Sequence, residues 1–213
     1  MKAGVSAIII AISMMAAPVW SAPDTVAIKE NQHYQVLDTG QAIPNNQLEV
    51  LEFFSFACPH CAHLEPTLQS WRKTLPKGVT FRRVPVIFRP QWENLAKVYY
   101  TLDGLKLAHL EPEVFKAIHE QNLDLSNTEE FMKWLGKHKV DEKKALMFYE
   151  SFTVSTKVSQ AKTLAQHYRI EGVPLLIVGG RYKTDVAMAG GAEKVPDVLN
   201  QLINIAQKKP FSK

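Results

Sequence analysis

The sequence predicts an α/β fold in which a small β-sheet is interrupted by an all-helical insertion. Runs of apolar, aromatic and β-branched residues, typical of buried strands, occupy positions 50–56, 79–86 and 173–178. Between about residues 90 and 169 the apolar residues instead recur every three or four positions, which is the period of an amphipathic helix. A strand, a helix and a strand therefore come first, a helical block follows, and the sheet then resumes.

The first strand leads directly into a helix. Pro59 falls where a helix best tolerates proline, at its first position, so Cys58 is expected to be the N-cap residue. Apolar residues at steps of four and three give this helix one buried stripe: Leu64, Leu68, Trp71 and Leu75. In the second strand, Pro85 predicts a strand end or an edge position because it has no N–H to donate within a sheet.

The insertion is predicted to contain several helices. Asn127 and Asp141 each precede an apolar helical stripe and are of the residue type preferred at helix N-caps. The aromatic residues of these stripes follow helical spacing and are interpreted as core, not as a cofactor site: Phe131, Trp134, Phe148 and Tyr149.

The sheet returns after Gly172, which is expected to end the last helix of the insertion. Gly179-Gly180 follows the strand at 173–178 and predicts a tight hairpin turn into a further strand near 181–183. Beyond Gly190-Gly191, a last amphipathic helix is predicted from its apolar positions: Val195, Val198, Leu199, Leu202, Ile203 and Ala206.

The N-terminus is typical of a secretory signal peptide, which we assign to residues 1–21. Lys2 precedes an uncharged apolar run that is too short to cross a bilayer comfortably, and small residues follow it. Cleavage after Ser21 fits the small-residue rule better than cleavage after Ala22. An uncleaved inner-membrane anchor is the alternative.

The remaining chain is divided into a sheet domain in two parts, residues 22–90 and 170–213, and the helical insertion at residues 91–169. A hydrophobic content of 46% supports a real core. The formal charge is +4, but no basic stretch interleaved with aromatic residues precedes the short tail Lys208-Lys209. The sequence therefore gives no support for nucleic-acid binding.

The only two cysteines of the chain lie three positions apart, in Cys58-Pro59-His60-Cys61. At a helix N-cap, unpaired backbone N–H groups and the positive end of the helix dipole favour a thiolate over a thiol. A stabilised thiolate attacks disulfides and also leaves readily, so Cys58 is predicted to be the nucleophile and Cys61, one turn later, the resolving thiol. A purely structural disulfide is disfavoured because closing so short a loop restrains little chain entropy.

The segment from Leu51 to Cys61, together with Gly172-Val173-Pro174 far downstream, resembles the DsbA family of exported thiol-disulfide oxidoreductases. The resemblance extends over almost the whole mature chain and includes further positions: Glu65, Arg83-Val84-Pro85-Val86, Ser151-Phe152 and Val178-Gly179-Gly180-Arg181-Tyr182. It implies that the α/β fold is thioredoxin-like, interrupted by the helical insertion, and that the protein works in the periplasm.

The resemblance also implies a cis peptide bond before Pro174, beside a Cys58–Cys61 disulfide. The backbone of Val173, which follows Gly172, would then be free to pair with an extended substrate segment as an added strand. The implied reaction is donation of the disulfide to reduced, newly exported proteins. A membrane partner resembling the oxidase DsbB would then reoxidise the dithiol, and no bound cofactor is implied.

Two residues near the cysteines are expected to take part in this chemistry. His60 lies within the active loop and is expected to stabilise the Cys58 thiolate by hydrogen bonding or positive charge. Glu52 lies in an apolar strand, where a carboxylate is costly to bury unless it is paired or protonated. We interpret Glu52 either as a proton acceptor for Cys61 or as a structural carboxylate.

The charge partner of Glu52 is open. The family often has a lysine on the strand after the first helix, whereas this chain has Phe81-Arg82-Arg83. Arg82 is considered as the replacement, with no partner as the other possibility. Glu65 is interpreted as a polar helix residue near the site.

Other functions of the same residues are considered. A disulfide reductase or isomerase of the same fold is one alternative. An isomerase normally holds its substrates in a dimeric cleft, and only about 28 residues separate Ala22 from Val50, which leaves no dimerisation domain before the dithiol. We therefore expect a monomeric oxidant.

A metal-binding or metal-transfer module is the alternative from a different class. Its candidate ligands are Cys58, Cys61 and His60, with His63 nearby. Structural zinc usually takes its second pair of ligands from a distant segment, and a helix turns His63 away from its neighbours by about 100° per residue. The redox dithiol is therefore the preferred interpretation.

Overall fold

The computed structural model describes residues 27–38 and 48–208. Its sheet has five strands in the order β1-β5-β4-β2-β3, in which β2 and β3 are parallel and all other neighbours are antiparallel. The strands are β1 (Gln35–Val36), β2 (Leu48–Phe54), β3 (Val79–Pro85), β4 (Leu175–Val178) and β5 (Tyr182–Asp185). Because β3 is an edge strand and Pro85 is its last residue, both expectations for this proline are confirmed.

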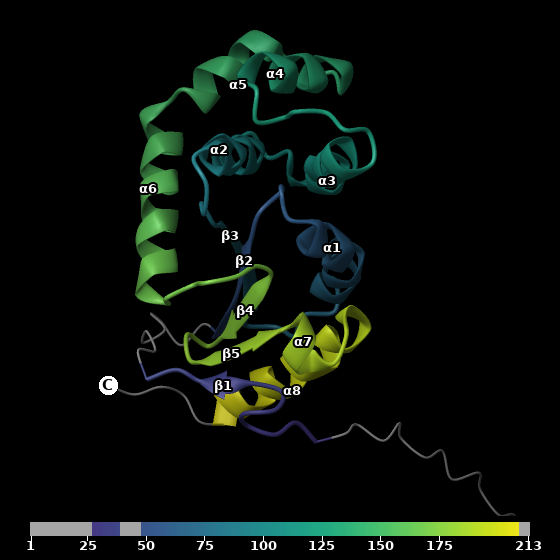
Figure 1. Cartoon of the computed structure of the whole chain (residues 1–213), viewed down its shortest axis with the longest axis vertical. Coiled ribbons are helices and arrows are strands. Elements are labelled where there is room, and N and C mark those ends of the chain that lie inside the picture. The colour runs from purple at the N-terminus through teal and green to yellow at the C-terminus, as the bar shows by residue number, and fades with distance from the viewer. Residues whose placement is uncertain (1–26, 39–47, 209–213) are drawn as a thin grey trace, which may run out of the picture.

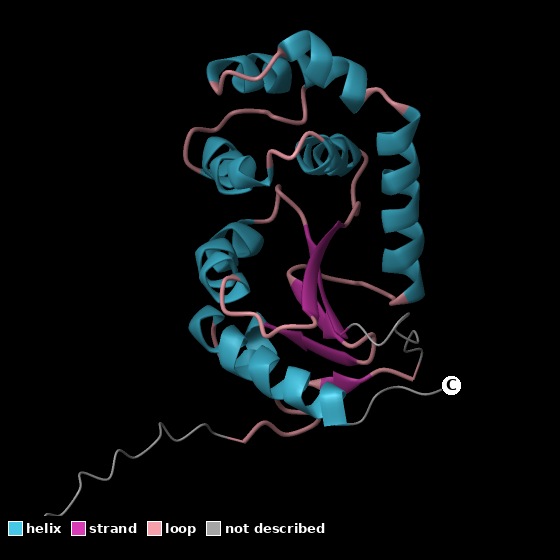
Figure 2. Ribbon diagram, turned by 180° about the vertical axis from the view of Figure 1, so that it is seen from behind, coloured by secondary structure: helices cyan, strands magenta, loops and turns pink. Residues whose placement is uncertain are grey.

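Strand β2 is buried at all but one of its positions because helices cover both faces of the sheet (Figures 1 and 2). Successive side chains of a strand point to opposite faces. Val50 packs in a core with α1 (Pro59–Arg72) and α8 (Val195–Lys208), whereas Leu51 packs on the other face with α6 (Phe152–His167).

Every described element between Gln91 and His167 is helical, so the predicted fold class is confirmed. Figure 1 shows the helices α2 to α5 as a block above the sheet, with α6 running back along its side. The helices of this insertion are α2 (Gln91–Gly104), the short 3₁₀ helix η2 (Ala108–Leu110), α3 (Glu111–His119), α4 (Thr128–Lys137), α5 (Glu142–Tyr149) and α6.

The insertion shares its core with the segment that carries the cysteines. One cluster of buried residues joins Phe56, Cys58 and Cys61 to the apolar side chains of α2 to α5. Its members include three of the predicted core aromatics: Phe131, Trp134 and Tyr149. Phe148 is only partly buried and packs against a smaller cluster beside α6.

The predicted helix N-caps are confirmed. The Asn127 side chain accepts a hydrogen bond from the backbone N–H of Glu130 at 3.1 Å, and Asp141 accepts one from that of Lys144 at 3.0 Å. Each cap satisfies a backbone donor that the first turn of a helix leaves without an internal partner.

Two short elements have no counterpart in the sequence-based prediction. Strand β1 has only two residues, too few for a periodic pattern, and it is defined by its pairing with β5. Helix α7 (Val186–Ala189) is a single turn, capped by the carboxylate of Asp185, which accepts from the N–H of Met188 at 2.7 Å. Such elements depend on tertiary neighbours more than on local periodicity.

The predicted boundaries differ from the observed ones by a few residues. The strand expected at 50–56 ends at Phe54 because a turn begins at Ser55. The strand expected from residue 173 begins at Leu175, and α1 ends at Arg72. Element ends are the positions that local patterns determine least well.

The predicted signal peptide at residues 1–21 lies outside the described residues. In the part of the chain that the structure describes, none of the helices combines the length and the apolar character that crossing a membrane requires. The division of the chain at residues 90 and 170 stays a prediction.

The cap of α4 provides a test of the insertion fold. Asn127→Ala is expected to lower the free energy of unfolding by about 1 kcal/mol, because the N–H of Glu130 loses its partner. Chemical denaturation of the reduced protein measures this change. Gln121→Ala, at an exposed position outside the helices, is the control, and an equal loss in both variants would contradict the role of the cap.

Candidate active site

A tight turn from Ser55 to Cys58 places Cys58 at the start of α1. The backbone N–H of Cys58 donates to the carbonyl of Ser55 at 3.0 Å, and the N–H of Ala57 donates to the Ser55 hydroxyl at 3.2 Å. Cys58 is the N-cap of α1 and Pro59 is the first helical residue, as the sequence predicts. The sulfur therefore lies at the end of the helix where backbone N–H groups lack internal acceptors.

The site lowers the pKa of the Cys58 thiol to about 6. The largest cause is a hydrogen bond from the Cys61 side chain, and smaller contributions come from the backbone N–H groups of Cys61 and His60 and from the charge of His60. Partial burial acts in the opposite direction. At neutral pH Cys58 is therefore mostly thiolate, the form that attacks disulfides.

Cys61 has the opposite character. Its side chain is completely buried, and burial is the largest cause that raises its pKa. The hydrogen bond to Cys58 and the negative charges of Cys58 and Glu52 raise this pKa further. One thiolate at the helix N-cap is thus paired with one fully buried thiol that keeps its proton.

The segment 172–174 lies against the reactive sulfur. The peptide bond between Val173 and Pro174 is cis, as the family resemblance implies. When Cys58 is protonated, its thiol donates to the Val173 carbonyl at 3.4 Å, although the two residues are 115 positions apart. Pro174 is buried beside the site, and Gly172 is exposed.

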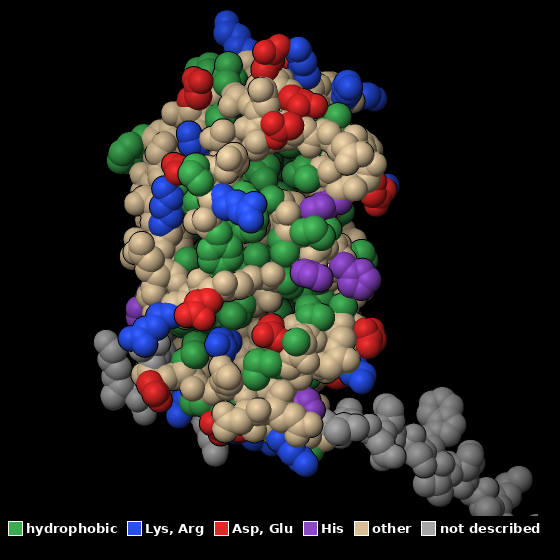
Figure 3. All heavy atoms as spheres, in the orientation of Figure 1, with side chains coloured by type: hydrophobic (Ala, Val, Ile, Leu, Met, Phe, Trp, Pro, Cys, Tyr) green, Lys and Arg blue, Asp and Glu red, His purple; other side chains and the backbone are tan. Residues whose placement is uncertain are grey.

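A groove of about 600 Å³ runs beside the segment 172–174. It begins at α1 with the exposed residues His60 and His63 and continues along β5. Its remaining lining residues are Arg169, Glu171, Gly172, Val173, Pro174, Leu175, Lys183, Asp185, Val186 and Ala187. In Figure 3, histidine side chains lie next to hydrophobic ones at the level of α1. The groove offers room for a polypeptide segment next to Cys58.

The insertion supplies side chains to the same site, which the sequence did not reveal. His119, at the end of α3, donates from Nε2 to the carbonyl of Phe56 at 2.8 Å. The ring of Phe115, one turn earlier, lies 4.9 Å from the ring of Phe56 in an edge-to-face arrangement. Both contacts hold the backbone just before Cys58.

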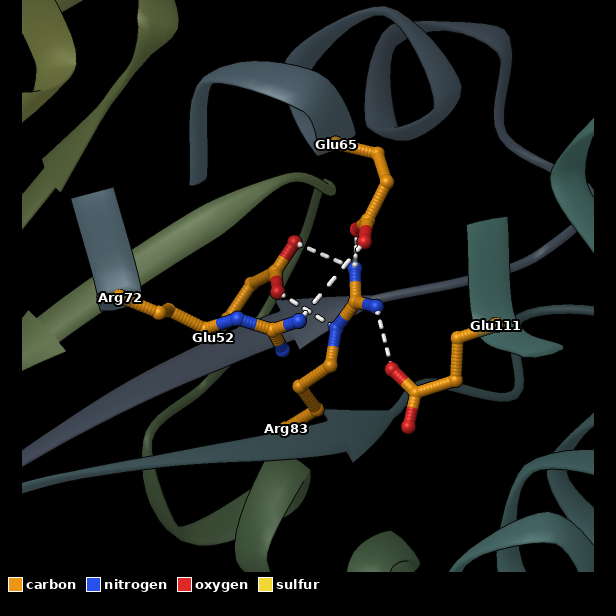
Figure 4. Close-up of polar contacts among 5 residues, drawn as sticks. All are labelled: Glu52, Glu65, Arg72, Arg83 and Glu111. Carbon is orange, nitrogen blue, oxygen red and sulfur yellow. Dashed lines mark hydrogen bonds and ion pairs between the residues drawn. The ribbon is translucent and has the colours of Figure 1, made fainter. Parts of the chain in front are cut away.

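A buried charge cluster surrounds the side chain of Arg83 (Figure 4), and one of its members, Glu52, acts electrostatically on Cys61. The guanidinium of Arg83 contacts three carboxylates, which come from β2, α1 and α3. Nε and Nη2 contact Glu52 at 2.7 and 3.3 Å, Nη2 lies 2.7 Å from Glu65, and Nη1 donates to Glu111 at 2.8 Å. All four side chains are at least nine-tenths buried.

Two expectations for this region are wrong. Arg82 does not replace the family lysine, because neighbouring side chains of β3 point to opposite faces and Arg82 pairs with Glu49 at 2.7 Å near the surface. Arg83 lies directly opposite Glu52 in the parallel register and is its partner. Glu65 is not an ordinary polar helix residue, since it is 3% exposed and contacts Arg83.

The environment of the cluster affects the ionisation of Glu65 and of Arg83 differently. Burial raises the pKa of Glu65, and the nearby cations Arg83 and Arg72 only partly offset this effect. Arg72 is 3.9 Å away, and neither oxygen of Glu65 makes a hydrogen bond of good geometry. Burial opposes the charge of Arg83 as well, but the three carboxylates together raise the pKa of its guanidinium. The guanidinium is therefore a permanent cation.

The metal alternative concerns the same residues, Cys58, Cys61 and His60. Across residues 27–38 and 48–208, the structure contains no group of three or more His, Cys, Asp or Glu side chains that could hold a metal ion. The carboxylates of the buried cluster surround a guanidinium instead.

Comparison with known proteins identifies the family. Residues 49–203 match the model of the DSBA-like thioredoxin domain. The chain belongs to this family. It is 37% identical to the thiol:disulfide interchange protein DsbA of Bordetella parapertussis over 195 aligned residues. These residues cover 90% of this chain and 93% of that protein. The DsbA of Azotobacter vinelandii is 36% identical over 181 residues, 83% of each chain.

Solved structures of the family have the same fold. The crystal structure of Pseudomonas aeruginosa DsbA superposes with a TM-score of 0.80 at 32% identity and covers 88% of this chain and 98% of that one. The oxidoreductase NmDsbA1 from N. meningitidis gives a TM-score of 0.76 at 31% identity, over 85% and 95% of the two chains. The protein is a thiol-disulfide oxidoreductase of the DsbA type, with a thioredoxin-like fold.

The thiolate at the helix start can be measured directly. Titration of the reduced protein by ultraviolet absorbance is expected to show ionisation of Cys58 with a midpoint near pH 6. Its reaction with disulfide reagents should therefore persist down to about that pH and be lost below it, where the thiol is protonated. Cys61→Ala is expected to raise the midpoint because it removes the main hydrogen bond. A midpoint of about 8 to 9 in the unsubstituted protein would contradict this assignment.

Proposed function

We propose that this protein is the periplasmic oxidant that donates its Cys58–Cys61 disulfide to reduced, newly exported proteins. The observation that carries the proposal is the pairing of a stabilised Cys58 thiolate with a buried Cys61 thiol at the start of α1. The N-terminal segment, which is typical of a signal peptide, supports export. Disulfides form and persist in such oxidising compartments.

The donation proceeds in two exchange steps. A client thiolate attacks the Cys58 sulfur, which breaks the Cys58–Cys61 bond, and the Cys61 sulfur leaves and takes up a proton. A second client thiolate then attacks the client sulfur of the mixed disulfide, and Cys58 leaves as the thiolate. The client gains one disulfide and loses two electrons, which the reduced dithiol retains.

The stabilised thiolate favours this direction. Each unit by which the pKa of Cys58 lies below the ambient pH stabilises the reduced protein by about 1.4 kcal/mol, equivalent to about 30 mV for a two-electron couple. A more stable reduced form makes the disulfide a stronger oxidant. The low pKa of Cys58 also makes its sulfur a good leaving group in the second step.

The segment 172–174 is proposed to hold the client during exchange. The Val173 carbonyl already lies next to the Cys58 sulfur, and the groove along Gly172, Val173 and Pro174 continues from it. An extended client segment that pairs with the Val173 backbone would be placed with its thiol near Cys58. His60 borders the same groove and adds positive charge beside the thiolate.

Recycling reverses the chemistry at Cys61. The Cys58 thiolate attacks a disulfide of a DsbB-like membrane oxidase, which breaks that bond and releases one oxidase sulfur as a thiolate. Cys61 then loses its proton and attacks the Cys58 sulfur, which closes the Cys58–Cys61 disulfide and releases the second oxidase sulfur as a thiolate. We propose Glu52 as the acceptor of this proton, since its charge acts on the buried Cys61 thiol. The protein is expected to work as a monomer.

The direction of the reaction is tested by a reduction potential and a refolding assay. Equilibration with glutathione is expected to give a potential well above the range of the cytosolic glutathione pool, and the oxidised protein is expected to reactivate reduced ribonuclease. Cys58→Ser should abolish this reactivation. A potential near −270 mV, typical of thioredoxin, would identify a reductase instead. Preferential rescue of scrambled ribonuclease would identify an isomerase.

The role of Glu52 is tested by separating the two thiol steps. In stopped flow with dithiobis(nitrobenzoate), the reduced protein releases one aromatic thiolate when Cys58 attacks and a second when Cys61 closes the disulfide. Glu52→Gln is expected to slow the second release by on the order of tenfold or more and to leave the first nearly unchanged. The control is Glu49→Gln, on the same strand and paired with Arg82. Equal second-release rates in both variants would exclude Glu52 as the acceptor.

A further inference from the structure

Glu111 is the member of the buried charge cluster that the helical insertion supplies. It is the first residue of α3 and is 4% exposed, and its carboxylate accepts from Nη1 of Arg83 (Figure 4). The other two carboxylates of the cluster, Glu52 and Glu65, belong to β2 and α1 of the sheet domain. The guanidinium of Arg83 thus contacts a carboxylate of the insertion and a carboxylate of the central strand β2 at the same time.

Helix α3 holds Glu111 in place through two further contacts. Glu111, Phe115 and His119 are spaced four residues apart, so they lie along one face of the helix. Phe115 packs against Phe56, and His119 donates to the Phe56 carbonyl. Both contacts fix the same face of α3, and so they hold its backbone where the Glu111 carboxylate reaches Arg83.

The contact between Glu111 and Arg83 affects the electrostatic environment of Glu52. A guanidinium that contacts a carboxylate with two of its nitrogens favours the ionised carboxylate, and therefore opposes transfer of a proton onto it. A second carboxylate on the remaining nitrogen offsets part of this positive charge. The charged or titratable groups that interact with Glu52 or with its partners in the cluster come from four elements: Cys61, Glu65 and Arg72 of α1, Arg83 of β3, Glu111 of α3 and Tyr99 of α2.

We propose that Glu111 is a positioning residue for the second thiol step, because its carboxylate on Nη1 of Arg83 offsets part of the positive charge that the guanidinium places on Glu52 and so helps Glu52 to take the Cys61 proton. This inference rests on the proposed role of Glu52. In the step itself, the Cys61 proton moves to a Glu52 oxygen and the Cys61 sulfur attacks the Cys58 sulfur. The bond from Cys58 to the bound partner sulfur breaks, and the partner leaves as a thiolate with the electron pair of that bond.

The test uses the two thiolate releases from dithiobis(nitrobenzoate) by the reduced protein. Glu111→Gln keeps an oxygen that can accept from Nη1 of Arg83 but removes the negative charge. It is expected to slow the second release by roughly threefold to tenfold and to leave the first unchanged. Glu113→Gln is the matched control, because Glu113 lies on the same helix and is exposed. Its contact with Lys116 is a long surface ion pair of 3.9 Å. Both releases should be unchanged in this control.

A double-mutant cycle separates the proposed role from a structural one. If Glu111 acts through Glu52, Glu111→Gln has no further effect in a Glu52→Gln protein. Glu111→Asp, which keeps the charge, should retain most of the second-release rate. The difference between Glu111→Gln and the unsubstituted protein should also vanish at high pH, where hydroxide removes the Cys61 proton.

Three outcomes would overturn the inference. In the first, the second release is as fast in Glu111→Gln as in Glu113→Gln. In the second, Glu111→Gln slows the second release equally in the unsubstituted and the Glu52→Gln protein. In the third, Glu111→Asp slows the second release as much as Glu111→Gln does. If Glu52→Gln does slow the second release in the same experiment, the role of Glu52 stands and only the role of Glu111 fails. A variant that does not fold loses the circular dichroism of the native protein, and its first release slows to the rate of an ordinary thiol. In that case Glu111→Ser replaces Glu111→Gln as the uncharged member of the comparison.

Discussion

The contact of one buried guanidinium with three carboxylates is the interaction on which the arrangement beneath the cysteines depends. Ions are costly to remove from water, and a buried charge persists only where partners and hydrogen bonds compensate it. Arg83 meets this requirement with carboxylates from β2, α1 and α3, and its guanidinium also lies 4.2 Å from the centre of the Phe54 ring. A single side chain therefore joins the central strand, the active-site helix and the insertion.

The two cysteines differ because the start of a helix and its interior are different environments. Cys58 is at the N-cap, where backbone N–H groups and a neighbouring thiol favour its anion. Cys61, one turn later, is surrounded by the core that the insertion completes, and the nearby negative charges make its own anion still less favourable. This asymmetry supports the proposed roles, in which Cys58 attacks external disulfides and Cys61 passes its proton to an acceptor.

The helical insertion is part of the active site as well as a cover for it. The face of α3 that carries Phe115 and His119 contacts the turn before Cys58, and the same face brings Glu111 to Arg83. Phe54 and Phe56 pack with the aromatic residues of α2 and α3. The insertion therefore makes two polar contacts with the sheet domain, through His119 and Glu111.

Local patterns in the sequence were sufficient for the elements whose signals are local. The period of apolar residues predicted the strands and the helical insertion, Asn127 and Asp141 predicted helix starts, and Cys58 before Pro59 predicted the N-cap cysteine and its helix. The pairing of Glu52 with Arg83, and not with Arg82, follows instead from the fold, because it depends on the register of β2 against β3. Glu65, Glu111 and His119 joined the site through packing between segments distant in the chain. No local pattern encodes such packing, since it is set by how whole elements bury their faces against one another.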